Sequence, residues 1–195
     1  MNIIATDLKD VYILEPRVFG DHRGWFLESW SERTMQEKGL YYNFIQDNHS
    51  YSSLKGTLRG LHCQHGEAAQ AKLVRCTRGA VMDFVVDIRK GSPTYKQWIA
   101  VELSADNFRQ LLIPKGFLHG FLTLTDDVEF LYKADNFYDK EEDRTIIWND
   151  PELGVVWGID DPIVSEKDSE APGYLESDLN FIYQEIGHNL KNNNQ

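Results

Sequence analysis

Several features that define other protein classes are missing from the sequence. It has no run of about 18 apolar residues, the length that a helix needs to cross a membrane, and its first residues lack the basic and apolar stretches of a signal peptide. Two cysteines, Cys63 and Cys76, are too few for a disulfide framework. Glycine-rich phosphate loops, the Gly-x-Gly-x-x-Gly fingerprint and the Gly-x-Ser-x-Gly elbow are also missing. We therefore expect a protein of the reducing cytoplasm with no membrane partner.

Positive charge is scarce overall, because 20 Lys and Arg residues face 31 Asp and Glu residues and the formal net charge is −11. A nucleic-acid partner is therefore not expected, since such proteins present a cationic face. The excess of acid is local, however. Residues 1–138 hold 16 basic and 17 acidic residues, whereas residues 139–178 hold 3 basic and 13 acidic ones. A small phosphorylated ligand remains compatible with the nearly neutral first part.

The sequence does contain many short alternations of apolar and polar residues. Its 195 residues are 42% hydrophobic, enough for one globular domain with a core. Residues 81–88 and 98–103 alternate with a period of two, which is typical of strands, and glycine- and proline-containing turns separate such segments. A mainly β sandwich or barrel is predicted.

Helices are expected to be few. Ser31 can cap a short helix that Gly39 ends. Residues 139–178 mix acids, prolines, glycines and aromatics, and we expect them to wrap a core built earlier in the chain. We assign residues 1–183 to a single domain and residues 184–195 to a polar, flexible tail.

Two histidine motifs could carry chemistry. In the segment 58–64, a period of two places His62 on one face and Arg59 on the other. A lone histidine is more often a hydrogen-bonded structural residue, but Arg59, Gln64 and Lys72 nearby favour a ligand site. Cys63 would face away from His62, so packing explains it better than nucleophilic catalysis.

The second motif, Pro114-x-Gly116-x-x-His119, has the spacing of the second motif of the cupin superfamily of β-barrels. Many cupins bind a metal through His-x-His, Glu and this last histidine. Here the first motif contains His62 and His65, whose offset of three turns them to opposite faces of a strand. We therefore predict a barrel without the metal-ligand set, in which His119 is a polar contact.

Nine segments, in order, resemble the dTDP-4-dehydrorhamnose 3,5-epimerase family of nucleotide-sugar enzymes. Each is weakly specific alone, but together they are strong, and the resemblance runs from about Val11 to Pro172, most of the chain. They are Glu15–Gly24, Gln46–Ser50, Leu58–His62, Gln70–Arg75, Val86–Arg89, Pro114–Phe121, Glu129–Lys133, Trp148–Pro151 and Ser165–Asp168.

This resemblance implies a mainly β, metal-free cupin, that is, a double-stranded β-helix or jelly-roll barrel with a few short helices, which forms a homodimer. It implies inversion of C3 and C5 of dTDP-4-dehydro-6-deoxy-D-glucose, giving dTDP-4-dehydro-L-rhamnose for dTDP-L-rhamnose biosynthesis. Both carbons lie next to the C4 ketone, so proton removal gives an enolate. The reaction needs a base, an acid on the opposite face and a cation near O4, but no cofactor.

The resemblance also assigns residues. His62 would be the base, oriented by Asp168, Tyr132 the acid, and Lys72 the cation near O4. Tyr138 would stack on thymine. The other residues implied to bind the dTDP part, some of them across the dimer from an exchanged N-terminal segment, are Arg23, Glu28, Gln46, Asp47, Asn48, Arg59, His119 and Lys167. Asp143 stands where the family commonly has a glutamate contact, and Cys63 where it commonly has an aromatic residue.

Other functions remain open. A mono-epimerase, or an epimerase of a related dTDP-4-keto sugar, could use the same residues. A metal-dependent cupin oxygenase and a non-catalytic nucleotide-sugar binder are less favoured. The resemblance argues against a mere binder, because binding alone needs no acid and base on opposite faces of a sugar.

Overall fold

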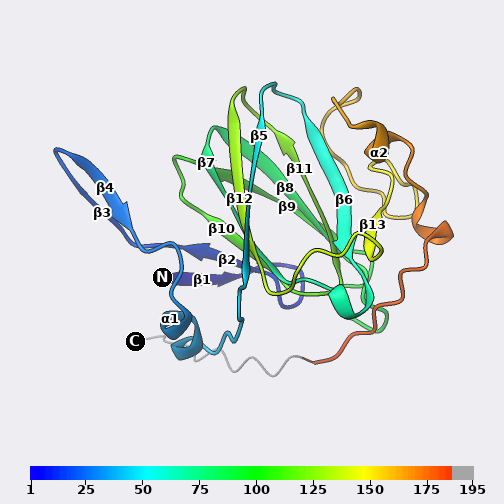
Figure 1. The fold of residues 1–195 in the computed structure, drawn as a ribbon, viewed down its shortest axis with the longest axis horizontal. Coiled ribbons are helices and arrows are strands. Elements are labelled where there is room, and N and C mark those ends of the chain that lie inside the picture. Colours follow the sequence, from blue (N-terminus) through cyan, green and yellow to red (C-terminus); the bar gives the residue numbers. More distant parts are fainter. Residues whose placement is uncertain (186–195) are drawn as a thin grey trace.

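The structure is a computed structural model that describes residues 1–185 (Figure 1). Most of the predicted polar tail, residues 186–195, lies outside the described residues, so its flexibility stays a prediction. Among residues 1–185, no helix is long and apolar enough to cross a membrane.

The described chain is dominated by antiparallel strands, which form two sheets and a separate hairpin. The six-stranded sheet contains, in spatial order, β1 (Asn2–Ala5), β2 (Tyr12–Glu15), β10 (Gln110–Ile113), β7 (Lys72–Arg78), β12 (Val128–Ala134) and β5 (Gln46–Ser52). The five-stranded sheet contains β13 (Asp143–Thr145), β6 (Leu58–Gln64), β11 (Phe117–Thr123), β8 (Ala80–Asp87) and β9 (Trp98–Ser104). The hairpin consists of β3 (Val18–Asp21) and β4 (Gly24–Leu27). The prediction of a mainly β barrel is confirmed.

The first core lies between the two sheets. Apolar side chains of both sheets meet there, including Val74 and Phe130 from one sheet and Val85 and Phe121 from the other. The rings of Phe121 and Phe130 lie 4.3 Å apart between their centroids. The predicted alternation of apolar and polar residues therefore buries one face of each sheet.

A second core lies on the outer face of the five-stranded sheet. Leu61, Phe84 and Leu118 from that sheet pack against Leu153 and Trp157 of the late acidic segment. Apart from β13, this segment holds only the helix α2 (Glu166–Ser169) and the 3₁₀ helix η2 (Tyr174–Glu176), while η1 (Gly66–Ala68) lies before β7. The prediction that residues 139–178 wrap the core is confirmed.

The predicted early helix is α1 (Glu32–Glu37). Ser31 caps it by accepting a hydrogen bond from the backbone N–H of Thr34, and the chain leaves the helix through Gly39 at φ +84°. Met35 is buried in a third apolar cluster, against Leu14 and other residues of the six-stranded sheet. The helix therefore anchors the N-terminal region to the barrel.

The hairpin β3–β4 projects away from the barrel, and we call residues 18–27 the arm (Figure 1). Seven of its eight strand residues are exposed, and its apolar side chains Phe19, Trp25 and Phe26 are 50, 62 and 69% exposed. Trp25 contacts Phe108 at the arm's base, with ring centroids 4.8 Å apart. Most of the arm's apolar surface is left in solvent.

Candidate active site

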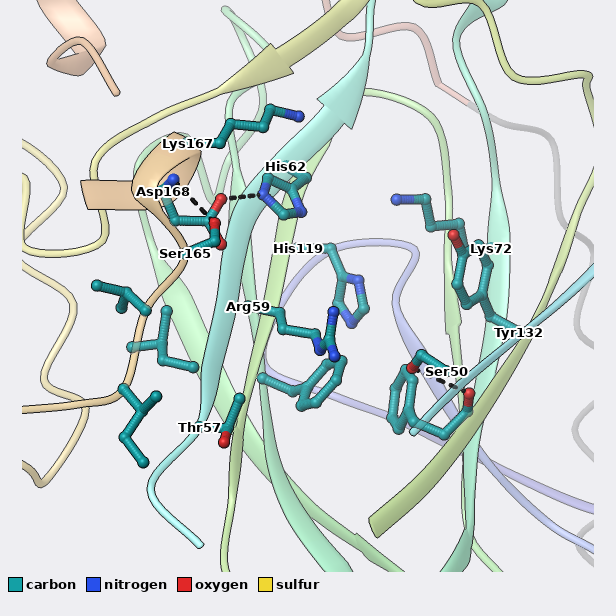
Figure 2. Close-up of a pocket in the computed structure, with 15 residues that line it drawn as sticks. Ser50, Thr57, Arg59, His62, Lys72, His119, Tyr132, Ser165, Lys167 and Asp168 are labelled. Atoms are coloured by element: carbon teal, nitrogen blue, oxygen red, sulfur yellow. Dashed lines mark hydrogen bonds and ion pairs between the residues drawn. The ribbon is translucent and has the colours of Figure 1, made fainter. Parts of the chain in front are cut away.

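A cavity of about 400 Å³ opens between the two sheets (Figure 2). The five-stranded sheet contributes Arg59, His62 and His119 to its wall, and the six-stranded sheet contributes Ser50, Lys72, Phe130 and Tyr132. The helix α2 adds Lys167 and Asp168 at one edge. Catalytic groups predicted from distant parts of the chain are thus brought together in one place.

His62 is held by Asp168, with 2.6 Å between Nε2 and Oδ1 (Figure 2). Asp168 is 3% exposed, and its backbone N–H donates to Ser165 Oγ, the cap of α2. Burial opposes ionisation of Asp168, but hydrogen bonds from His62 and the Ser165 hydroxyl lower the pKa of this carboxyl. An ionised carboxylate only accepts, so the imidazole carries its proton on Nε2. Its Nδ1 keeps a free lone pair and can act as a base.

Arg59 and His62 both line the cavity, so the prediction that they face opposite ways is wrong. The pairing of β6 with β11 shifts register by one residue, because His119 lies opposite His62 but Phe121 lies opposite Arg59. Such an irregularity changes which face the next side chains take. It occurs at Gly60, at φ +122°, where a Cβ would lie 2.7 Å from the facing backbone.

Arg59 also joins the two sheets. Its Nε donates to Ser52 Oγ at 3.2 Å and its Nη2 donates to the carbonyl of Tyr51 at 3.1 Å, both on β5. The guanidinium, with further donors available, is therefore fixed at one end of the cavity.

Tyr132 and Lys72 lie across the cavity from His62 (Figure 2). The Lys72 ammonium is 5.6 Å from the centroid of the Tyr132 ring. Burial raises the pKa of Tyr132, so its phenol stays protonated and can donate. Burial lowers the pKa of Lys72, and among residues 1–185 no hydrogen-bond or ion-pair partner holds its ammonium. Its charge is therefore available to a ligand.

His119 is 8% exposed and lies directly opposite His62 in the pairing of β11 with β6. Its Nε2 lies 2.9 and 3.1 Å from the two carboxylate oxygens of Asp83. Asp83 lies on β8 and has no solvent exposure. Sequence reasoning missed Asp83, although a carboxylate between Val81 and Val85 on the inward face of a strand was a usable signal.

Further predicted residues form a polar rim beside α2. Asp143 Oδ2 accepts from the Lys167 ammonium at 2.6 Å and from the Tyr138 hydroxyl at 3.2 Å, while its Oδ1 accepts from Gln64 at 3.3 Å. The backbone N–H of Tyr138 donates to the side chain of Gln46 at 3.3 Å. The ring of Tyr138 is thus fixed at both ends while 54% of the residue remains exposed.

Besides Tyr138 and Asp143 on the rim, five predicted residues do not line the cavity of this chain. Asp47 lies on the outer face of β5, where it pairs with Lys133 at 2.9 Å, whereas Gln46 and Asn48 are partly buried on the opposite face and bond to each other. Arg23 is at the tip of the arm and pairs with its neighbour Asp21. Glu28 follows the arm and accepts from Thr34. Their assignment to substrate binding stays a prediction.

The residues of the first cupin motif are dispersed. His65 bonds to Asn180 at 2.8 Å and lies 3.4 Å from Glu142, away from His62. Residues 1–185 contain no group of three or more His, Cys, Asp and Glu side chains placed to hold a metal. Cys63 is buried in the second core, and burial raises the pKa of its thiol to about 12, so its predicted packing role is confirmed.

Comparisons with known proteins agree with this geometry. The family model for dTDP-4-dehydrorhamnose 3,5-epimerase matches residues 5–176. The epimerase of that name from Escherichia coli K12 is 56% identical over 158 residues, which are 80% of this chain and 85% of the relative. The dTDP-6-deoxy-D-glucose-3,5-epimerase of Legionella pneumophila, solved with dTDP-4-keto-L-rhamnose, superposes with a TM-score of 0.88 at 42% identity, covering 94% of this chain and 98% of that one. The Bacillus anthracis epimerase, solved with TDP and pyrophosphate, has a TM-score of 0.86 at 48% identity, covering 88% and 98%.

Proposed function

The chain belongs to the dTDP-4-dehydrorhamnose 3,5-epimerase family, and we propose that its cavity inverts C3 and C5 of dTDP-4-dehydro-6-deoxy-D-glucose to give dTDP-4-dehydro-L-rhamnose. One observation carries the mechanism. His62, the base, and its hydrogen-bond partner Asp168 lie on one side of the cavity. Tyr132 and Lys72 lie on the other side. A sugar ring between them would meet a base on one face and an acid on the opposite face.

The proton transfers follow from this arrangement. Nδ1 of His62 takes the proton from C3 or C5, and the electron pair of the C–H bond forms the enolate of the C4 ketone. Tyr132 then donates its phenolic proton to the same carbon from the opposite face, and the ketone is restored in the inverted configuration. Exchange with water returns the proton to Tyr132 and removes it from His62, so the site is ready for the second centre.

Lys72 would stabilise the enolate. Its ammonium is partly buried beside Tyr132 and has no partner among the described residues that would compete for it. A preorganised cation close to O4 favours the negative charge that develops in the transition state, and a partly dry cavity strengthens this interaction. Neither the proton transfers nor the enolate calls for electrons from a cofactor.

The dTDP part would bind along the rest of the cavity and at its rim. Arg59 offers a permanently charged fork for the diphosphate, and His119 and Lys167 offer further donors. Tyr138, fixed by Gln46 and by Asp143, provides an exposed ring on which thymine can stack. Asn48 bonds to Gln46 on the same face of β5.

Arg23 and Glu28 would act in a homodimer. The arm that carries Arg23 projects from its own barrel and exposes Phe19, Trp25 and Phe26, a surface that favours contact with another chain. In a dimer with twofold symmetry, each arm would cover the partner's barrel while its own barrel receives the partner's arm. We propose that this exchange delivers Arg23 and Glu28 to the partner's diphosphate. The same dimer would test whether Asp47 contributes to binding of the substrate.

We also propose that the enzyme works in the cytoplasm. Cys63 and Cys76 are both free and buried in the structure, which agrees with a reducing compartment.

The experiment that tests the function supplies dTDP-4-keto-6-deoxyglucose in D₂O and follows the sugar by NMR. We expect deuterium at both C3 and C5. Label at a single carbon would indicate a mono-epimerase, and no label would leave only a nucleotide-sugar binder. Stoichiometric iron in the purified protein, together with a requirement for it, would favour the oxygenase alternative.

A further inference from the structure

Asp83 is a buried carboxylate that the mechanism above does not use. It has no solvent exposure, and the neighbouring inward residues of β8, Val81 and Val85, belong to the apolar core between the sheets. Moving a carboxylate from water into such surroundings costs several kcal/mol unless it is paired. The barrel could be built with an apolar residue at this position, as at its neighbours. Buried charges of this kind cluster at functional sites.

The hydrogen bonds of Asp83 go to a residue of the cavity. Within residues 1–185, its two oxygens bond only to Nε2 of His119, at 2.9 and 3.1 Å. Since a carboxylate accepts, the ring proton belongs on Nε2, and Nδ1 is the nitrogen left for a ligand. The ring of Phe130 lies nearly parallel to that of His119, with 6.2 Å between centroids. Asp83 and Phe130 together fix the orientation of the imidazole.

Lys72 lines the same cavity as His119, the hydrogen-bond partner of Asp83, and the charges of Asp83 and Lys72 influence each other. Burial lowers the pKa of Lys72, while negative charge on Cys63, Asp143 and Asp83 acts to raise it. In return, burial raises the pKa of Asp83, while His119 and Lys72 act to lower it. Each of the two groups therefore favours the ionised form of the other.

Cys63 and Asp143 act on the pKa of Lys72 more strongly than Asp83 does, but neither is a free buried charge. The Cys63 thiol, with its pKa raised to about 12, is uncharged near neutral pH. Asp143 already accepts hydrogen bonds from Lys167 and Tyr138. The Tyr132 ring, which also faces the ammonium, is a neutral phenol. Of the two carboxylates that act on Lys72, Asp83 is the one that has no solvent exposure and, among residues 1–185, no lysine or arginine partner.

We propose that Asp83 is a positioning residue of the epimerisation: it holds His119 by Nε2 and balances the charge of Lys72 beside the enolate. The inference rests on the proposed function, because Lys72 acts there as the cation near O4. Asp83 would not touch the sugar. It would act through Lys72 and His119, and its loss would affect the chemical step more than the affinity for the nucleotide.

The test compares Asp83→Asn with Glu129→Gln. The first variant keeps the shape and an oxygen acceptor for His119 but removes the charge. The second removes the same charge from a carboxylate–histidine pair on the outer side of β12, where Glu129 lies 3.4 Å from His49. Rates of deuterium exchange at C3 and C5, the dTDP dissociation constant and the pH profile of kcat are measured for both.

We expect Asp83→Asn to lower kcat about 100-fold, the scale of losing one preorganised electrostatic contribution, with dTDP affinity within about twofold. The alkaline limb of the kcat profile should move to lower pH, because Lys72 without its counter-charge loses its proton more readily. Glu129→Gln should change none of the three. An Asp83→Asn enzyme with normal kcat and an unmoved alkaline limb would overturn the proposal.

A double-variant cycle separates action through Lys72 from a general loss of structure. If Asp83 works through Lys72, adding Asp83→Asn to the Lys72→Met variant should lower kcat much less than Asp83→Asn lowers kcat in the unaltered enzyme. An equal loss of kcat in the unaltered enzyme and in the Lys72→Met variant would contradict this.

Should Asp83→Asn fail to fold, the unaltered protein still gives an answer. Histidine labelled with ¹⁵N, with His119 assigned by a His119→Gln variant, should show a proton on Nε2. An unprotonated Nε2 would overturn the proposal. If instead the unaltered protein exchanges neither sugar proton, the proposed function fails, and this outcome is distinct from the NMR result.

Discussion

The cavity wall and the arm differ in how their functional side chains are held. On the wall, His62 is bonded to Asp168 and His119 to Asp83, and both carboxylates are 3% exposed or less. On the arm, the charged tip residue Arg23 pairs, among residues 1–185, only with its neighbour Asp21, and the strands around it are exposed.

This difference separates chemistry from nucleotide binding. Proton transfer demands groups held at hydrogen-bond distance from the reacting carbon in a fixed orientation, and one chain supplies them on a rigid barrel. Binding of a diphosphate can use a group delivered by a second chain, because the charge-assisted hydrogen bonds of an arginine to phosphate are strong in themselves. The comparison predicts that variants of the proton-transfer residues on the wall lose kcat and that variants of the arm lose affinity.

The largest effect should follow from His62→Ala. Without the base, exchange of deuterium at both C3 and C5 should fall about 1,000-fold or more, while dTDP binding, measured by calorimetry, stays within about twofold. Substantial remaining exchange at either carbon would show that the base lies elsewhere.

Tyr132→Phe should give the next largest loss of activity, and it should separate proton removal from inversion. Removing the phenolic proton should lower the rate of inversion about 100-fold, while exchange at the carbons, which needs only His62, falls much less. Inversion is followed by NMR of the product and exchange by deuterium content. Equal losses in both measurements would argue against Tyr132 as the acid.

Arg23→Ala should raise KM about 10- to 100-fold with a small change in kcat, the scale of losing hydrogen bonds to a charged group. Co-expression of Arg23→Ala with His62→Ala chains is the sharper measurement. If arms are exchanged, a mixed dimer has one complete site, so a random mixture assayed well below the raised KM should recover about a quarter of normal activity. No recovery in purified mixed dimers would show that Arg23 serves its own barrel or no site.

Asp143→Glu should have the smallest effect. The longer carboxylate still reaches Lys167 and Tyr138 at the exposed rim, so KM should change by less than about threefold and kcat should not change. Steady-state kinetics with Asp143→Ala as the matched deletion measures this. A large fall in kcat for Asp143→Glu would place Asp143 in the chemical step and would contradict its assignment to binding.

The sequence by itself determined the fold class, two of the strands, the first helix and the family. Period-two alternation marked β8 and β9, Ser31 and Gly39 marked α1, and nine ordered motifs identified the epimerase family and with it His62 and Tyr132. These signals are local in the chain, because alternation and capping depend on residues only a few positions apart.

The tertiary structure decided which side chains share the cavity. Arg59 joins His62 only because β6 shifts register against β11, and Asp83 becomes a partner of His119 only because β8 pairs with β11. Asp47 faces outward, and Arg23 lies on an arm away from its own cavity. The physical reason is that strand register and sheet packing depend on residues far apart in sequence, and a shift of one residue exchanges the buried face for the exposed one.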